Sequence, residues 1–179
     1  SFSFKSNGHR FYLLTSVVSN LSLVYDIDER MFWQITDASG NYFPFISATY
    51  NTAGQTIFQH ASNGKLYTID EAVYTDDSEI ITVDVITPNF DGGVRRRKQM
   101  KVMEFIADQT VGSVLQVRKN DSDYEAGKWS NFRMVDLSKK KPVLTDCGTF
   151  MRRAHNFRHQ KQTAFRMQAV EMQIDLGVL

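Results

Sequence analysis

The densest group of side chains that could do chemistry lies between residues 120 and 130. Asp121, Asp123 and Glu125 alternate with other residues, as the first ligands of a calcium loop do. Calcium takes about six to eight oxygen ligands, and the EF-hand loop ends on a bidentate carboxylate at a spacing that this segment lacks. We therefore predict no metal site here.

Two histidines and the single cysteine form a second pattern of possible metal ligands. His155 and His159 are four residues apart, and Cys147 precedes them. On a helix the pair would share a face and could bind zinc with a third ligand. On a strand the same spacing separates them by about 13 Å, too far for one metal. Because we predict a strand here, we expect surface histidines and no zinc site.

The sequence shows no pattern for nucleophilic catalysis. It has no Gly-x-Ser-x-Gly elbow, Cys147 has no recognisable partner motif, and no carboxylate pair is placed by a pattern. A single cysteine also excludes an internal disulfide. Trp33 and Trp129 are most simply core residues. We therefore predict no catalytic residue, no cofactor and no enzymatic activity.

Basic side chains gather in the second half of the chain and could contact phosphates or an acidic protein. The alternative is that they are solvated on turns and strand faces, since the sequence shows no aromatic stacking platform. The residues predicted to contact double-stranded DNA or a partner are Arg95, Arg96, Arg97, Lys98, Arg152, Arg153 and Arg158.

Charge is distributed unevenly along the chain. Residues 1–90 carry four Lys/Arg against ten Asp/Glu, a net charge of −6, and the remainder carries seventeen against ten, a net charge of +7. This asymmetry fits a module whose two ends face different neighbours, or a nucleic acid near the basic half. An uneven distribution of solvated side chains explains it equally well.

The elements that would position these residues are strands. Ile81, Val83 and Val85 alternate with polar residues, which places three apolar side chains on one strand face. The parity of the apolar residues changes near Ala169–Val170, which predicts a bulge. Asn63-Gly64 predicts a tight hairpin. The expected strands are 10–15, 22–26, 31–36, 43–50, 56–61, 65–70, 79–87, 99–107, 113–119, 129–137, 148–158 and 163–176.

Many short strands at this spacing predict an all-β, antiparallel fold. We expect a partial β-propeller of about three four-stranded blades, or propeller blades plus a β-sandwich. The Pro88–Val94 stretch predicts a boundary between β blades at residues 1–88 and a second β subdomain at 89–179. No run of about 18 apolar residues occurs, so we predict no membrane insertion. Since the chain begins at Ser1, we expect a fragment or a processed product.

One segment of the second subdomain resembles the Asp-box hairpin, Ser-x-Asp-x-Gly-x-Thr-Trp. The Ser-x-Asp part corresponds to Ser122–Asp123 and the Gly-x-Trp part to Gly127–Trp129, with a longer spacing and no threonine. In Asp-boxes the acidic side chain caps the turn and the tryptophan packs beneath it. The resemblance implies that Ser122, Asp123, Gly127 and Trp129 form a structural hairpin of a propeller blade.

Several short motifs follow one another along the chain in a recognisable order: Gly8–Leu13, Leu23–Asp26, Trp33, Asn63–Tyr67, Tyr74–Asp77, Arg95–Lys98 and Ser122–Asn131. This order resembles the C-terminal part of the tail hub proteins of short-tailed bacteriophages, also called packaged-DNA stabilisation proteins. The resemblance spans roughly residues 8–176, and it departs from the family where the segment Arg152–His159 lacks an expected tryptophan.

The resemblance implies a structural subunit of a virion tail, made in the cytoplasm of the bacterial host. Several copies would form a homo-oligomeric ring at the portal–adaptor channel, seal the packaged DNA and seat other tail proteins. The alternative function is a glycan-binding or glycan-cleaving module of sialidase type, which the Asp-box alone suggests. Such a site would need clustered arginines and carboxylates around a common axis, and the sequence shows no such pattern.

Overall fold

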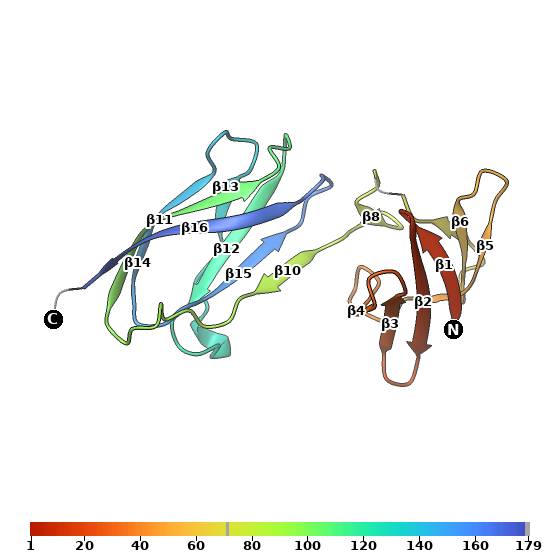
Figure 1. The fold of residues 1–179 in the computed structure, drawn as a ribbon, viewed down its shortest axis with the longest axis horizontal. Helices are drawn as coiled ribbons and strands as arrows, with labels where there is room; N and C mark the ends of the chain where they lie inside the picture. Colours follow the sequence, from red (N-terminus) through yellow and green to blue (C-terminus); the bar gives the residue numbers. More distant parts are fainter. Residues whose placement is uncertain (71, 178–179) are drawn as a thin grey trace. The chain divides into compact units, whose positions relative to one another are not determined.

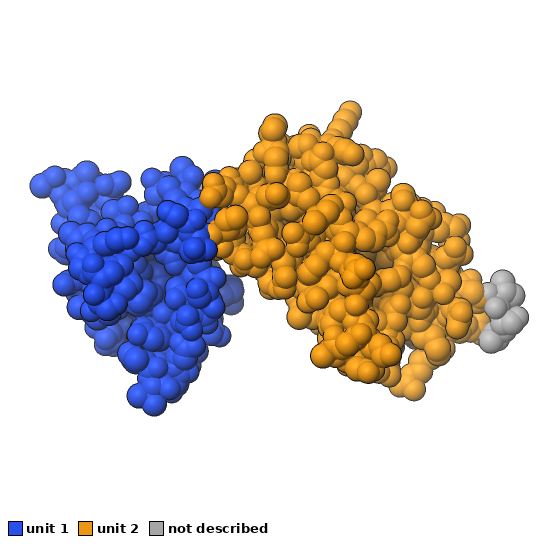
Figure 2. Space-filling model, turned by 180° about the vertical axis from the view of Figure 1, so that it is seen from behind, with its two compact units in different colours: residues 1–79 blue, residues 80–179 orange. Residues whose placement is uncertain are grey.

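The computed structural model describes residues 1–70 and 72–177, and it divides into two compact units, Ser1–Glu79 and Ile80–Leu179 (Figure 2). The regular elements of the described residues are antiparallel strands, apart from one 3-10 turn at Ala126–Lys128. The all-β prediction is therefore confirmed. In the described part of the chain, no helix is long and apolar enough to cross a membrane.

The first unit opens with a four-stranded sheet whose strands follow chain order, as in a propeller blade (Figure 1). Asn7-Gly8 closes its first hairpin with both residues at positive φ, a conformation that glycine adopts without steric cost. The strands are β1 (Phe2–Ser6), β2 (His9–Ser16), β3 (Leu21–Asp26) and β4 (Met31–Gln34).

A three-stranded sheet completes the first unit, followed by the two-stranded ribbon of β8 (Thr75–Asp76) and β9 (Glu79–Ile80). The Asn63-Gly64 hairpin is confirmed, because Phe58 pairs directly with Tyr67 across it. The three strands are β5 (Phe45–Tyr50), β6 (Thr56–His60) and β7 (Leu66–Thr68).

A phenylalanine cluster forms the core of the first unit. Phe58 is 1% exposed, and its ring centroid lies 5.1 Å from that of Phe4 and 5.5 Å from that of Phe45. Phe4 and Phe58 belong to different sheets, so these contacts join the sheets. Phe2 and Phe4 alternate on β1, a strand that the sequence analysis did not predict.

The second unit is a β-sandwich of a four-stranded and a three-stranded sheet (Figure 1). Their strand orders, β10-β15-β12-β13 and β14-β11-β16, join segments far apart in the chain. The strands are β10 (Val83–Ile86), β11 (Lys98–Ala107), β12 (Val114–Asn120), β13 (Arg133–Asp136), β14 (Val143–Phe150), β15 (Ala154–His159) and β16 (Met167–Leu176).

Side chains from both sheets form the core of the sandwich. Phe105 on β11 and Phe157 on β15 meet edge to face at 6.0 Å, and Leu115 on β12 is fully buried between the layers. The architecture thus agrees with the second form of the prediction, blades plus a sandwich. The sheets have four, four, three, three and two strands, so four-stranded blades do not account for the whole chain.

Two boundaries differ from the predicted ones. The first unit ends at Glu79 in the sequence and not at the predicted residue 88, because β10 pairs with β15 and so belongs to the sandwich. The single strand expected at 148–158 is two strands, since the chain passes from one sheet to the other through Met151 and Arg152.

The predicted bulge and the predicted apolar strand face both occur in the second unit. The bulge expected near Ala169–Val170 occurs next to Ala169, where β16 shifts register between Met167 and Ala169. The predicted apolar face of β10 exists, but Val83 and Val85 are 36% and 47% exposed, because β10 is an edge strand.

Candidate interaction site

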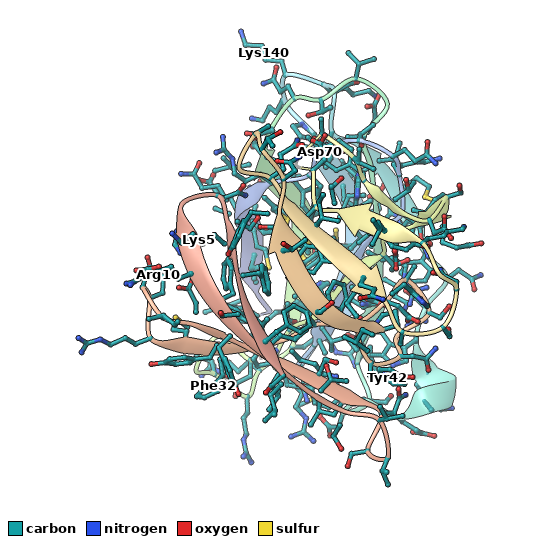
Figure 3. The ribbon with its side chains drawn as sticks, turned by 90° about the vertical axis from the view of Figure 1, so that its right-hand side faces the viewer. Lys5, Arg10, Phe32, Tyr42, Asp70 and Lys140 are labelled. Atoms are coloured by element: carbon teal, nitrogen blue, oxygen red, sulfur yellow. The ribbon has the colours of Figure 1, made fainter. Side chains whose placement is uncertain are left out.

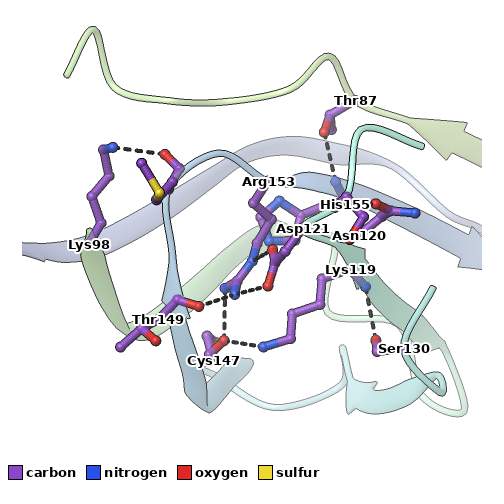
Figure 4. Close-up of polar contacts among 12 residues, drawn as sticks. Thr87, Lys98, Lys119, Asn120, Asp121, Ser130, Cys147, Thr149, Arg153 and His155 are labelled. Atoms are coloured by element: carbon purple, nitrogen blue, oxygen red, sulfur yellow. Dashed lines mark hydrogen bonds and ion pairs between the residues drawn. The ribbon is translucent and has the colours of Figure 1, made fainter. Parts of the chain in front are cut away.

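Arg153 is the centre of a buried polar network in the sandwich (Figure 4). Its Nε and Nη2 atoms donate to the carboxylate of Asp121 at 2.6 and 2.8 Å, and Nη1 donates to the Cys147 carbonyl at 2.7 Å. The guanidinium also lies 4.4 Å from the centroid of the Phe150 ring. The side chain is 0% exposed, so the predicted contact with DNA or a partner is wrong for Arg153, which joins β14 and β15 internally.

Lys98 is also a structural residue. It is 1% exposed, and its ammonium donates to the carbonyls of Arg96 and Met151 at 2.9 Å and to that of Val94. These bonds use all three donors of the ammonium and close the loop before β11 against the corner between β14 and β15. The predicted surface contact is therefore wrong for Lys98 too.

Arg152 and Arg158 reach the surface, but each already has a carboxylate partner. Arg152 pairs with Asp123, and both side chains are about half exposed. Arg158 donates from Nε to Asp84 at 2.9 Å and lies 4.9 Å from the Phe132 ring centroid. Their contact with a partner stays a prediction, and it would compete with these ion pairs.

Arg95, Arg96 and Arg97 are exposed, and among the described residues none of them has an ion-pair partner. They form the exposed arginine run of the second unit. The structure thus separates the seven predicted contacts into three open arginines, two paired ones and two buried cations. Sequence alone could not make this distinction, because the residue types are the same.

The Asp-box resemblance falls on the loop between β12 and β13, but Asp123 does not cap its turn. Asp123 instead accepts from Arg152 and from Asn89. The cap is Asn120, which is fully buried; its Oδ1 accepts from the Ser122 N–H at 2.7 Å and its Nδ2 donates to the Glu125 carbonyl at 2.9 Å. Among the other predicted hairpin residues, Ser122 supplies that N–H, and Gly127 lies in the 3-10 turn Ala126–Lys128.

Trp129 is half-buried and packs against a cation instead of lying beneath the turn. The Arg118 guanidinium lies 5.0 Å from its ring and 4.6 Å from that of Phe132. Arg118 in turn donates to the fully buried Asn156 at 2.8 Å. Guanidinium groups of the protein itself thus pack against the rings of Trp129 and Phe132, where a sugar or base would otherwise stack.

A cavity of about 290 Å³ opens beside the Arg153 network. We call it the β12–β14 pocket. Buried residues of the sandwich core, Met103, Val117, Leu144 and Cys147, form its apolar lining. Its charged lining, which no sequence pattern indicated, includes the cations Lys119, Arg133 and Arg153 and the acidic residue Asp146.

Burial and charge shift the pKa values of groups lining this pocket. Burial, followed by the nearby Arg153, lowers the pKa of Lys119. Burial also raises the pKa of the Cys147 thiol, and so keeps it protonated. Burial and the Arg153 charge lower the pKa of His155 to about 4, so this imidazole is neutral at pH 7.

The predicted surface position of His155 and His159 is wrong. They are 5% and 2% exposed, because alternate residues of β15 point into the sandwich. The His155 ring stacks on Phe157, whereas His159 Nε2 lies 3.1 Å from Ser113 Oγ. Asp121 and Asp123, the first carboxylates of the calcium-like pattern, bind arginines.

The first unit holds a cluster of possible metal ligands that no sequence pattern indicated. The ligand atoms of His9, Asp26 and Asp28 lie within 4.8 Å of one another. Their oxygens already have protein partners: Asp26 accepts from His9 Nδ1 at 2.8 Å and from two backbone N–H groups, and Asp28 binds Arg10. This hydrogen bonding explains the cluster as the cap of the turn after β3.

The first unit leaves one apolar sheet face uncovered. Tyr12, Leu14 and Phe32 are 44%, 53% and 70% exposed on the face of the β1–β4 sheet that points away from the phenylalanine core. The rings of Tyr25 and Phe32 pack against each other on this face, tilted by 38° and with their centroids 4.6 Å apart. Figure 3 labels Phe32 and Arg10 at the outside of this sheet. A face of this kind is typical of a surface that binds another molecule.

A scan against models of protein families found no match to this chain, and a search of curated proteins found no significant relative. The class of protein therefore follows from the fold, which is an all-β protein of two antiparallel units.

Proposed function

We propose that this chain is a non-enzymatic docking subunit of a multi-copy assembly. In its specific form, the proposal is a ring-forming component of the tail of a short-tailed bacteriophage, which seals packaged DNA and seats neighbouring tail proteins. The motif order supports the phage tail, and the surface properties of the two units support the docking role.

The opposite charge of the two folded units is the observation that carries the docking role. The first unit, residues 1–79, holds four Lys/Arg and nine Asp/Glu, a net charge of −5; the second, residues 80–179, holds seventeen and eleven, a net charge of +6. A head-to-tail ring brings two different surfaces of one chain together at each interface. An acidic unit facing the basic unit of the next copy would make that interface electrostatically favourable.

The uncovered apolar face of the first unit supplies a nonpolar surface for the same kind of contact. Charge complementarity mainly sets the orientation and association rate, whereas buried apolar area supplies most of the affinity. Tyr12, Leu14 and Phe32 would lose solvent exposure in an assembled ring. The exposed arginine run would contact either the acidic neighbour or DNA phosphates.

The proposal is tested by comparing charge reversal in the exposed arginine run with charge reversal at three exposed lysines elsewhere in the second unit. Arg95, Arg96 and Arg97 change together to Glu, and a matched control changes Lys139, Lys140 and Lys141, which are also exposed and basic, to Glu. Both variants lose the same net charge. We expect the arginine variant to sediment as smaller species at low salt and the lysine variant to keep the oligomer of the unmodified chain.

Binding of a fluorescent DNA duplex by the same two variants separates the two roles of the arginine run. Loss of assembly with unchanged duplex binding assigns the run to a protein neighbour, and loss of duplex binding assigns it to DNA. If the arginine variant matches the lysine control in both assays, the proposed role of the run is wrong.

A further inference from the structure

The β12–β14 pocket combines an apolar lining with two cations, Lys119 and Arg133, whose hydrogen bonds go to backbone carbonyls; the acidic residue Asp146 also lines it. Lys119 donates to the Cys147 carbonyl at 2.6 Å, and Arg133 donates to the Asp146 carbonyl at 3.3 Å (Figure 4 for Lys119). Over the described residues, neither side chain forms an ion pair. Arg153 is different, because Asp121 holds two of its nitrogens.

A partly buried cation without a counter-ion is unfavourable. Transfer from water weakens its solvation, and the nearby Arg153 adds like-charge repulsion. The lowered pKa of Lys119 has these two causes. A bound anion would remove both costs, and charge-assisted hydrogen bonds in such a site are stronger than neutral ones.

The backbone of β14 has an unusual conformation beside the Lys119 ammonium. Asp146 and Gly148 have φ values of 54° and 76°, and they flank Cys147, whose carbonyl accepts from both Lys119 and Arg153. A Cβ atom on Gly148 would lie 3.1 Å from Lys119 Nζ. The glycine therefore leaves room for the ammonium at the pocket.

The apolar lining of the pocket limits which anions can fill it. Met103, Val117 and Leu144 are buried residues of the sandwich core that line the pocket. The volume of about 290 Å³ is at the lower end for ligand pockets, so it suits one apolar side chain or ring with its charged group. Inorganic phosphate would leave this apolar surface unfilled.

We propose that the β12–β14 pocket binds a carboxylate carried on an apolar group, with Lys119 and Arg133 holding the carboxylate and the apolar group lying on Met103 and Leu144. The same chemistry occurs in a small apolar acid and in the C-terminal residue of a polypeptide. This inference does not depend on the proposed tail function, because it rests only on the second unit.

The test uses two acids and their uncharged analogues with the whole chain. The first pair of probes is 3-phenylpropionate and 3-phenylpropanol. The second is a hexapeptide ending in phenylalanine, with a free or an amidated C-terminus. We expect each acid to shift the backbone amide NMR signals of Cys147 and Gly148 and to bind about tenfold more tightly than its uncharged analogue.

Three variants place the binding at the pocket. We expect Lys119→Met and Arg133→Met each to weaken the acids about tenfold, and Lys139→Met, an exposed control, to leave them unchanged. Arg133 is exposed, so its variant keeps the test valid if Lys119→Met does not fold. A tighter peptide identifies a polypeptide terminus as the ligand, and a tighter phenylpropionate identifies a free acid; both support the proposal.

The proposal is overturned if the acids and their uncharged analogues bind equally. It is also overturned if inorganic phosphate binds as tightly as the acids, or if no signal near Cys147 shifts at millimolar probe. The proposal is likewise overturned if Arg133→Met and Lys119→Met both bind the acids with unchanged affinity.

Discussion

Arg152 and Arg153 are neighbours in the sequence but lie in opposite environments. Arg153 is fully buried and its partner Asp121 is about one-third exposed, whereas Arg152 and its partner Asp123 are both about half exposed. Breaking a buried ion pair leaves an uncompensated charge, while an exposed pair is weak because water screens it. The two pairs therefore offer a matched comparison within one protein.

We predict that Asp121→Asn lowers the free energy of unfolding by roughly 2–4 kcal/mol. The equivalent change at the exposed pair, Asp123→Asn, costs roughly 0–1 kcal/mol. Urea unfolding followed by fluorescence in a Trp33→Phe background, in which Trp129 alone reports the second unit, measures both. Equal decreases in the free energy of unfolding would show that the buried Arg153–Asp121 pair contributes no more to stability than the exposed Arg152–Asp123 pair.

His155 makes stability depend on pH, because the folded state holds its imidazole neutral. Its pKa is about 4 in the folded chain and 6.5 when unfolded. Above pH 6.5 neither state is protonated and the stability is fully present. Between pH 6.5 and 4 only the unfolded state takes up the proton, so stability falls, by roughly 3 kcal/mol in total.

We predict that His155→Phe removes this contribution and flattens the pH dependence between 6.5 and 4. The measurement is the midpoint of urea unfolding at several pH values in the variant and the unmodified chain. The carboxylates contribute to both proteins alike, so the difference between the two slopes isolates His155. Parallel slopes would mean that the imidazole is not desolvated.

Residue types alone could not separate structural cations from open ones. In the sequence, Lys98 and Arg153 each lie beside other basic residues, as exposed cations often do. Only the tertiary fold brings to them the carbonyls and the carboxylate with which their buried charges form hydrogen bonds. Arg97 directly precedes Lys98 and stays exposed. The β12–β14 pocket was missed for the same reason, since its lining comes from five strands, β11 to β15.

At the scale of elements, the loop after β12 is held by an amide and not by the acidic residue of an Asp-box. Asn120 supplies two hydrogen bonds from a fully buried position. We predict that Asn120→Ala destabilises the second unit by roughly 1–3 kcal/mol, because the Ser122 N–H and the Glu125 carbonyl lose their partner.

Asp123→Ala is the comparison for this loop, and urea unfolding is again the measurement. If Asp123 acted as in an Asp-box, its loss would cost more than the loss of Asn120. The expected order is the reverse.

Local patterns predicted the strands better than their connections. Alternating apolar residues and Asn-Gly turns depend on neighbours in sequence, which is why the β6–β7 hairpin and the bulge near Ala169 could be predicted. The corner at Met151 and Arg152 depends on which sheet each strand joins. That choice is set by the core of the sandwich, and no local pattern carries it.

At the scale of the molecule, each unit has its own core and its own tryptophan. Trp33 lies in the first unit and Trp129 in the second. The core clusters of the two units share no residue within the described ranges. Separate cores allow separate unfolding.

We predict two unfolding transitions with different midpoints. Trp33→Phe leaves Trp129 to report the second unit, and Trp129→Phe leaves Trp33 to report the first. Fluorescence during thermal unfolding of the two variants gives each midpoint, and calorimetry of the unmodified chain checks that both transitions are present. Coincident midpoints and a single calorimetric peak would mean that the units unfold as one.

The opposite charges of the two units and the uncovered face of the first lead to one claim, that the chain works as a docking subunit beside other copies. The mass of the unmodified chain in solution, measured by light scattering at low and high salt, tests this claim most directly. We predict a ring-sized oligomer at low salt that dissociates as salt screens the charges. A monomer of 20.6 kDa at every salt concentration would contradict it.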